Sequence, residues 1–145
     1  MSHVTIKEAN NAEHQIKDLT ALKRAVARFP NAVFLEGKRT FKAYGDEGDK
    51  VKNVRHAIGL MKSNKSYEVG ICESKMFPGT FNLAFDSFSR ELEPVFGEGL
   101  EKLSMFYHAE ALRSQAMRNH DVYREQIMAD GTIIAEMDTT VRMGV

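Results

Sequence analysis

The stretch RHAIGLMKS (residues 55–63) and the two that follow it, YEVGICES (67–74) and TFNLAFDSF (80–88), establish the fold class. Each is rich in apolar residues and is about as long as a β-strand. The polar stretch SNKS (63–66) lies between the first two, and the turn-forming stretch MFPG (76–79) lies between the second and the third. Short connections of this kind join neighbouring antiparallel strands. The sequence therefore predicts three consecutive antiparallel strands.

A short strand and a helix are expected before these three strands. Val4 and Ile6 alternate with polar residues, which is typical of a strand with one buried face. Asp18 is a favourable N-cap, and apolar residues recur after it at helical spacing until Pro30 ends the pattern. These apolar residues are Leu19, Leu22, Val26 and Phe29. Their common face predicts a helix that packs on the core.

Between that helix and residue 55 we expect more strand and an exposed loop. The stretches AVFLEG (32–37) and RTFKAY (39–44) indicate one long strand or two strands that are interrupted near Gly37. The stretch YGDEGDKVKN (44–53) has two glycines, three acids and two lysines in ten residues. This composition predicts a mobile loop on the surface.

A second helix is expected from about residue 100 to residue 119, and it carries two apolar stripes. One stripe consists of Leu100, Leu103, Tyr107 and Ala111, and the other of Met105, Ala109, Leu112 and Ala116. A helix with two apolar faces packs on the sheet and also contacts a second surface. Two alternatives remain open for that surface, namely a loop of the same chain or the interface of a homo-oligomer.

The last element is a hairpin that the dipeptide Asp130-Gly131 indicates. It separates VYREQIM (122–128) from TIIAEMD (132–138). If the turn is a two-residue type I′ turn, Glu125 lies directly opposite Glu136 on the far face of the hairpin. Two carboxylates side by side would suit a divalent cation or acid-base chemistry, although a solvated strand face is far commoner.

Together these elements predict a single α+β domain over residues 1–145. We expect a mainly antiparallel sheet with two helices packed on one face, and ferredoxin-like features. The order strand, helix, strand, strand occurs over residues 4–63 and again over residues 80–139, which suggests a weak internal repeat. The sequence does not define the order of the strands in the sheet.

Composition limits the kinds of partner and the compartment. Twenty Lys and Arg residues balance twenty Asp and Glu residues, so no overall field attracts nucleic acid or an anionic membrane. No signal peptide and no long apolar stretch is found, which predicts a cytoplasmic protein that does not contact a membrane. The single cysteine, Cys72, lies in an apolar alternation and is expected to be a buried hydrophobic residue.

No catalytic motif is present, and this favours a non-enzymatic role. The chain has no phosphate loop, no dinucleotide-binding glycine pattern, no nucleophile elbow and no zinc-binding His-Glu-x-x-His. We therefore predict no catalytic residue, no metal ligand and no cofactor. Tyr107 and His108 are candidate binding residues, but adjacent residues on a helix point to different faces, so at most one of them faces a given pocket.

One local cluster is compatible with single-stranded nucleic acid. Cations alternate there with aromatic side chains, a mixture that provides phosphate contacts and stacking platforms. The candidate residues are Lys38, Arg39, Phe41, Lys42, Tyr44 and Arg55. Neighbouring acids weaken this pattern, and an ordinary charged sheet edge is the commoner explanation.

Short motifs along the chain resemble those of a family of small uncharacterised proteins. The motifs are SHVTIK at residues 2–7, DLTALKRAV at 18–26, YEVGI at 67–71, the pair Leu103 and Tyr107, and DGTIIAEM at 130–137. The family occurs in cyanobacteria, in algal plastid genomes as the conserved open reading frame of the thirty-five type, and in bacteriophages. This resemblance implies the fold and leaves the activity open, because the family has no established activity.

The leading hypothesis from the sequence is a non-enzymatic binding or accessory protein. Its partner would be a protein or a small ligand, bound through the sheet face or the second helix, and the second helix could also mediate a homo-oligomer. If the chain is encoded by a phage, the expected location is the host cytoplasm. The alternatives are a single-stranded nucleic-acid-binding protein and a small metal-dependent enzyme built around His108 or the pair Glu125 and Glu136.

Overall fold

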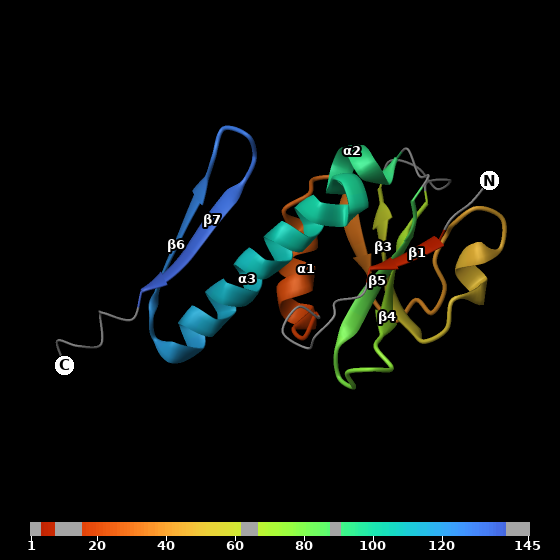
Figure 1. Ribbon diagram of the computed structural model, residues 1–145, viewed down its shortest axis with the longest axis horizontal. Helices are drawn as coiled ribbons and strands as arrows, with labels where there is room; N and C mark the ends of the chain where they lie inside the picture. Colours follow the sequence, from red (N-terminus) through yellow and green to blue (C-terminus); the bar gives the residue numbers. More distant parts are fainter. Residues whose placement is uncertain (1–3, 8–15, 62–66, 88–90, 139–145) are drawn as a thin grey trace.

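The computed structural model describes residues 4–7, 16–61, 67–87 and 91–138 (Figure 1). Five strands form one antiparallel sheet in the order β1-β5-β4-β3-β2, and two more form a separate antiparallel hairpin. The strands of the large sheet are β1 (Val4–Lys7), β2 (Ala32–Leu35), β3 (Val54–Leu60), β4 (Val69–Glu73) and β5 (Phe81–Asp86). The hairpin consists of β6 (Val122–Ile127) and β7 (Ile133–Asp138). Ser2, His3 and the whole SNKS stretch (63–66) lie outside the described residues.

The described helices are α1 (Leu19–Ala27), α2 (Leu92–Phe96) and α3 (Glu101–Asn119), with 3-10 turns at η2 (Glu47–Lys50) and η3 (Glu98–Leu100). The structure confirms the predicted α+β class, with its mainly antiparallel sheet. The three consecutive strands predicted from residues 55–88 are β3, β4 and β5, and they occupy adjacent places in the sheet.

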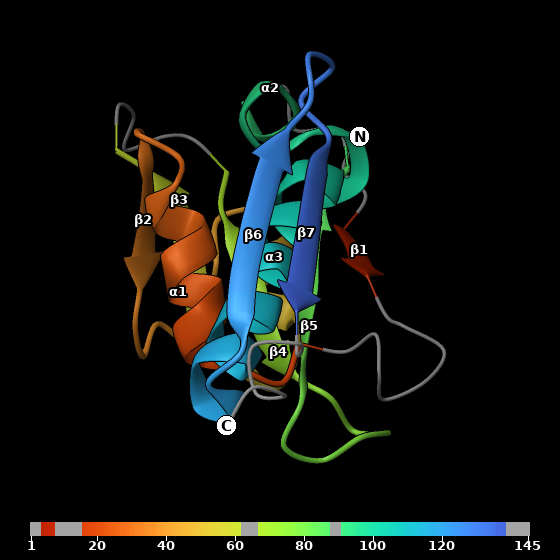
Figure 2. The same ribbon diagram turned by 90° about the vertical axis from the view of Figure 1, so that its left-hand side faces the viewer.

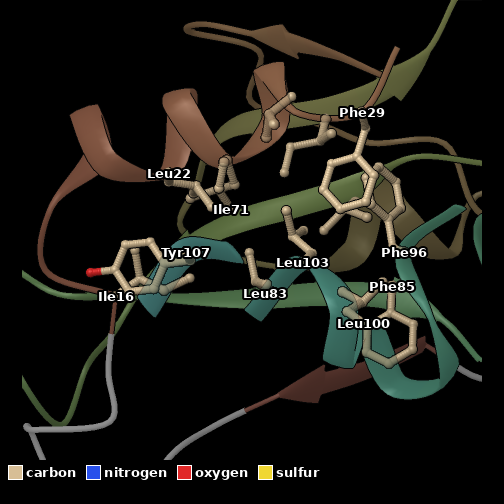
Figure 3. Close-up of a cluster of buried hydrophobic side chains, with 14 of the residues drawn as sticks. Ile16, Leu22, Phe29, Ile71, Leu83, Phe85, Phe96, Leu100, Leu103 and Tyr107 are labelled. Carbon is tan, nitrogen blue, oxygen red and sulfur yellow. The ribbon is translucent and has the colours of Figure 1, made fainter. Parts of the chain in front are cut away.

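Helices α1 and α3 cover one face of the large sheet, and the main core lies between them and the strands (Figure 3). Leu22 of α1 and Leu103 of α3 are fully buried against Ile71 and Leu83 of the sheet. Side chains of these types each stabilise the fold by roughly 1.5–3 kcal/mol when they leave water. The predicted apolar face of each helix is therefore the face that meets the sheet.

A tyrosine on α3 fixes the start of α1. The Asp18 carboxylate accepts a hydrogen bond from the backbone N–H of Ala21 at 3.1 Å, as expected for an N-cap. The buried Tyr107 hydroxyl accepts hydrogen bonds from the backbone N–H groups of Lys17 at 2.9 Å and Asp18 at 3.2 Å. Tyr107 therefore satisfies backbone groups ahead of α1 and couples the two helices.

The opposite face of the sheet, here called the helix-free face, is covered by residues 36–53, the covering segment (Figure 1). Phe41 is only 2% exposed and packs flat on Gly70 of β4, where an added Cβ would lie 2.4 Å from its ring. Gly48 is buried beneath the backbone carbonyl of Phe41. The prediction of a strand over residues 39–44 is wrong, because these residues fold onto the sheet face without pairing as a strand. The loop predicted over residues 44–53 is largely exposed, as expected, although it contains the turn η2 and buries Gly48.

A buried carboxylate explains why the covering segment does not form a strand. Glu68 is 7% exposed, and its Oε1 accepts the backbone N–H of Lys42 at 2.9 Å and the ammonium of Lys38 at 2.5 Å. The backbone N–H of Glu68 in turn donates to the carbonyl of Lys42 at 2.8 Å. The alternation of apolar residues in RTFKAY thus directs side chains toward the sheet face without adding a strand to the sheet.

The C-terminal hairpin packs on α3 from the side opposite the sheet (Figure 2). The backbone N–H of Ile133 donates to the Met105 Sδ at 3.4 Å, and Ala109 on the same helix is buried. The hairpin therefore covers the second apolar stripe of α3. Of the two alternatives for this stripe, the structure shows a contact within the same chain. The expected order of strand, helix, strand, strand is present twice, but the second pair of strands forms this separate layer instead of joining the sheet.

The hairpin register differs by one residue from the prediction. Ile127 lies opposite Ile133 and Glu125 lies opposite Ala135, because the connection has three residues, 129–131, closed by the N–H of Met128 donating to the Thr132 carbonyl. Glycine at the last loop position, with φ of 88°, is typical of a type I turn with a bulge. A one-residue shift reverses the face of every side chain, so the prediction that Glu125 faces Glu136 is wrong.

Glu125 instead joins the hairpin to the body of the protein. The Arg28 guanidinium at the end of α1 donates through both terminal nitrogens to the Glu125 carboxylate, and its Nη2 also lies 2.9 Å from Glu110 of α3. The Tyr123 hydroxyl donates to the same carboxylate at 2.8 Å. These hydrogen bonds, with Arg28 first, lower the pKa of Glu125, while burial raises the pKa of Tyr123 to about 12.

Replacing the glycine under Phe41 tests the covering layer. We expect Gly70→Ala to lower the free energy of unfolding by about 1–3 kcal/mol, because the methyl group collides with a buried ring. Urea denaturation followed by circular dichroism measures this. Gly59→Ala is the matched control, since its Cβ would lie 3.3 Å from the tip of the Leu35 side chain and at ordinary contact distance from Glu68 Oε2 and Val33 Cγ1. Equal effects of the two substitutions would contradict the packing of Phe41 on β4.

Removal of the guanidinium tests the attachment of the hairpin. We expect Arg28→Gln to destabilise the protein by about 2 kcal/mol, because it leaves the mostly buried Glu110 and Glu125 without their cation. Hydrogen exchange should show faster opening of β6 and β7 than of the large sheet. Arg124→Gln is the control, because Arg124 is 61% exposed and pairs with Glu136 and Asp138, which are 61% and 26% exposed. It should change stability by less than about 0.5 kcal/mol.

The same contact predicts a pH dependence. The pKa of Glu125 is lower in the folded than in the unfolded protein, so its ion pair stabilises the fold above about pH 5 and loses this effect as the carboxylate is protonated. The stability difference between the native protein and Glu125→Gln should therefore shrink in acid. A difference that stays constant from pH 7 to pH 3 would contradict this role of the Glu125 charge.

Candidate functional site

An open cleft of about 510 Å³ lies on the helix-free face, between β1 and the covering segment. It is lined by Val4, Ile6, Glu47, Lys50, Val51, Lys52, Asn53, Cys72, Glu73, Lys75 and Asn82. Its volume lies within the range of about 300–1,000 Å³ that is common for small-molecule sites.

Strand pairing brings the walls and the floor of the cleft together. Val4 and Ile6 of β1 pair with Asp86 and Ala84 of β5, and residues directly opposite each other point to the same face. The covering segment packs its apolar side chains, Phe41 and Ala43, against Ala84 and neighbouring residues, but Ile6 stays 45% exposed. The cleft is therefore the part of the helix-free face that the covering segment leaves open.

The floor of the cleft consists of two nearly buried side chains that face each other across adjacent strands. Cys72 of β4 pairs with Asn82 of β5, and each is 4% exposed. Burial raises the pKa of the Cys72 thiol to about 11, so the thiol stays protonated near neutral pH. Cys72 thus offers a small apolar surface, and Asn82 places a polar amide beside it.

The backbone of the covering segment is tied to β4 at the rim. Asn53 has a positive φ of 64°, a conformation that asparagine tolerates better than most residues, and its carbonyl accepts the N–H of Glu73 at 2.9 Å. This bond fixes the chain where it passes from η2 into β3. Lys50, Val51 and Lys52 therefore reach the cleft from a short segment that is held at the sheet.

The charges at the rim are unequal. The Lys50 ammonium lies 3.5 Å from Asp46 and 3.8 Å from Glu47, and Arg55 lies 3.2 Å from Glu73. Lys52 and Lys75 are exposed, and no carboxylate among the described residues lies within ion-pair distance of either. Each glutamate of the cleft thus has a cation within ion-pair distance, whereas the cations Lys52 and Lys75 are available to a ligand.

The residues proposed for nucleic-acid binding do not form one surface. Phe41 is buried between the sheet and its own segment, so the prediction that it stacks on bases is wrong. Lys38 is paired with Glu68, and Arg55 is paired with Glu73. These ion pairs neutralise cations that phosphate binding would require.

The other three residues of that set are exposed. Tyr44 is 54% exposed, and its backbone N–H donates to the Asp86 carboxylate at 3.3 Å, which ties this end of the covering segment to β5. Arg39 and Lys42 are exposed on the same segment. None of the three is among the residues that line the cleft.

Tyr107 and His108 face in different directions, as the helical geometry requires. Tyr107 is buried and binds backbone groups ahead of α1, whereas His108 is exposed. The centroids of the two rings are 5.3 Å apart. Tyr107 is therefore a structural residue and the prediction that it binds a ligand is wrong. Within the described part of the chain, no group of three or more His, Cys, Asp or Glu side chains could hold a metal ion.

Comparison of the chain with protein-family models, with curated proteins and with solved structures gives no match. The resemblance to the family of cyanobacteria, plastids and phages therefore stays a prediction. Of the helices in the described ranges, none is both long and apolar enough to cross a membrane.

Sequence reasoning missed the cleft because its residues come from four separate segments. Ile6, Lys52, Lys75 and Asn82 are far apart in the chain, and only the strand order brings them together. One local signal was available: Asn82 interrupts the apolar stretch TFNLAF at a position that faces away from the helices. A polar amide in a buried strand requires hydrogen-bond partners and often marks a site.

Cys72 provides a probe of the cleft floor, because it is the only cysteine of the chain. We expect the native protein to react with Ellman's reagent at pH 8 about 100-fold more slowly than the urea-unfolded chain, because burial raises the thiol pKa to about 11. Absorbance at the wavelength of the released thiolate measures both rates. Similar rates in the two states would show that the floor is open to solvent.

Proposed function

We propose that this chain is a non-enzymatic binding protein that holds a small ligand in the cleft on its helix-free face. The observation that supports this most directly is the combination of an apolar wall at Ile6 and Val51 with the nearly buried amide of Asn82. Apolar contact supplies affinity, and a few fixed polar groups supply orientation and specificity.

The chemistry of the cleft favours binding over catalysis. The only nucleophilic side chain in its floor, Cys72, has a raised pKa and lacks the thiolate character that reactive cysteines need. The carboxylate of Glu73 is engaged with Arg55, and that of Glu47 faces Lys50. These groups are arranged to neutralise one another.

Single-stranded nucleic acid is the weaker proposal. It depended on aromatic stacking beside free cations, and Phe41 is a core residue while Lys38 and Arg55 are engaged in ion pairs. Tyr44 remains as an exposed aromatic side chain. Single-strand binders stack successive bases on several aromatic side chains, and this cluster keeps one.

Nuclear magnetic resonance with isotope-labelled protein tests the proposal. A library of small organic acids and neutral aromatic compounds is added, and we expect the amide signals of Ile6, Val51, Cys72 and Asn82 to shift together with at least one compound. Ile6→Gln should lower the affinity for that compound about fivefold, because a half-exposed apolar side chain of the cleft wall is lost.

The matched control is Ile134→Gln, since Ile134 is 42% exposed, close to the 45% of Ile6, but lies on the hairpin. This variant should bind the compound as the native protein does. The proposal fails if no compound shifts the cleft signals, or if both variants weaken binding equally.

A further inference from the structure

We infer that the cleft selects a small organic anion with an apolar body, an inference that rests on the proposed function. The two features that define this class lie at different places in the cleft. Ile6 and Val51 offer apolar contact at the wall, and Lys52 and Lys75 offer positive charge at the rim. A ligand that matches both has an apolar part and a single acidic head group such as a carboxylate, sulfonate or phosphate.

The charge balance of the lining residues carries this inference. Three lysines and two glutamates line the cleft. Glu73 pairs with Arg55 from just outside the lining, and Lys50 is shared by Glu47 and by Asp46, which also lies outside the lining. Lys52 and Lys75 then remain as two positive charges without a carboxylate partner in the described part of the chain. A neutral or cationic ligand would leave them uncompensated, whereas an anion complements them.

The depth of the cleft determines how such a ligand would lie. The cations have long flexible side chains and are exposed, so they reach the head group at the mouth while it keeps part of its hydration. Cys72 and Asn82 lie at the floor and are nearly buried, so the body of the ligand contacts a thiol and an amide.

Lys52 and Lys75 approach the mouth from different elements. Lys52 follows η2 in the covering segment, and Lys75 follows β4, whose register with β5 places Cys72 and Asn82 at the floor. The bond between the Asn53 carbonyl and the N–H of Glu73 joins these two elements beside the lysines. The backbone positions of the two lysines are therefore fixed relative to each other by this contact.

A pair of fluorescent probes that differ by one charge tests the inference. The anion 8-anilinonaphthalene-1-sulfonate and its neutral analogue N-phenyl-1-naphthylamine have the same apolar body. At low salt we expect the anion to bind more tightly than the neutral probe and to shift the nuclear magnetic resonance signals of the cleft amides. The affinity for the anion should fall as salt is added. The double variant K52Q/K75Q should bind the anion about fivefold more weakly and should bind the neutral probe as the native protein does.

The matched control is K17Q/R118Q, which removes the same charge from exposed residues that do not line the cleft. It should bind both probes as the native protein does. Equal binding of the two probes at the cleft, with no effect of K52Q/K75Q, overturns the anion inference and leaves the proposed function intact. If neither probe shifts the cleft signals while the library compounds also fail to do so, the proposed function itself is overturned.

Discussion

The central strands β3, β4 and β5 bury side chains on both faces, and this constraint governs the rest of the molecule. Helices α1 and α3 cover one face, and the chain has no further long helix to cover the other within the described residues. The covering segment performs that task with a single large side chain, Phe41, which requires glycine at position 70 beneath it. Because the segment is short, part of the helix-free face stays open, and that open part is the candidate site.

The hairpin has a different relation to the body. It adds no strand to the large sheet and packs on α3, and its Glu125 binds Arg28 at the end of α1. Arg28 therefore joins the end of α1, α3 and β6 through charged hydrogen bonds, and it gives their packing a fixed geometry. Directional contacts of this type define one arrangement among several that apolar surfaces alone would tolerate. The face of the hairpin that points away from α3 carries Ile134 and the exposed ion pairs of Arg124.

Much of the fold could be predicted because local patterns were strong. The cap at Asp18, the alternation in YEVGIC and the dipeptide Asp130-Gly131 each act over a few residues, and the structure confirms the elements they indicate. Errors arose where a distant residue decided the outcome. Glu68 binds the backbone near Lys42 and prevents a strand there, and no pattern within residues 39–44 reveals this. The cleft was missed for the same reason, since it depends on the order of strands in the sheet.

The three-residue connection of the hairpin gives the length of this surface loop unusual importance. Insertions and deletions are ordinarily tolerated best at loop tips. Here a two-residue turn at Asp130-Gly131 would pair Ala129 with Thr132, and the pairing would shift by one position. Such a shift would bring Glu136 opposite Glu125, and β7 could no longer present Ala135 and Ile133 to α3 while β6 keeps Glu125 on Arg28. Sequence drift at this exposed tip should thus be restricted to substitutions that preserve its length.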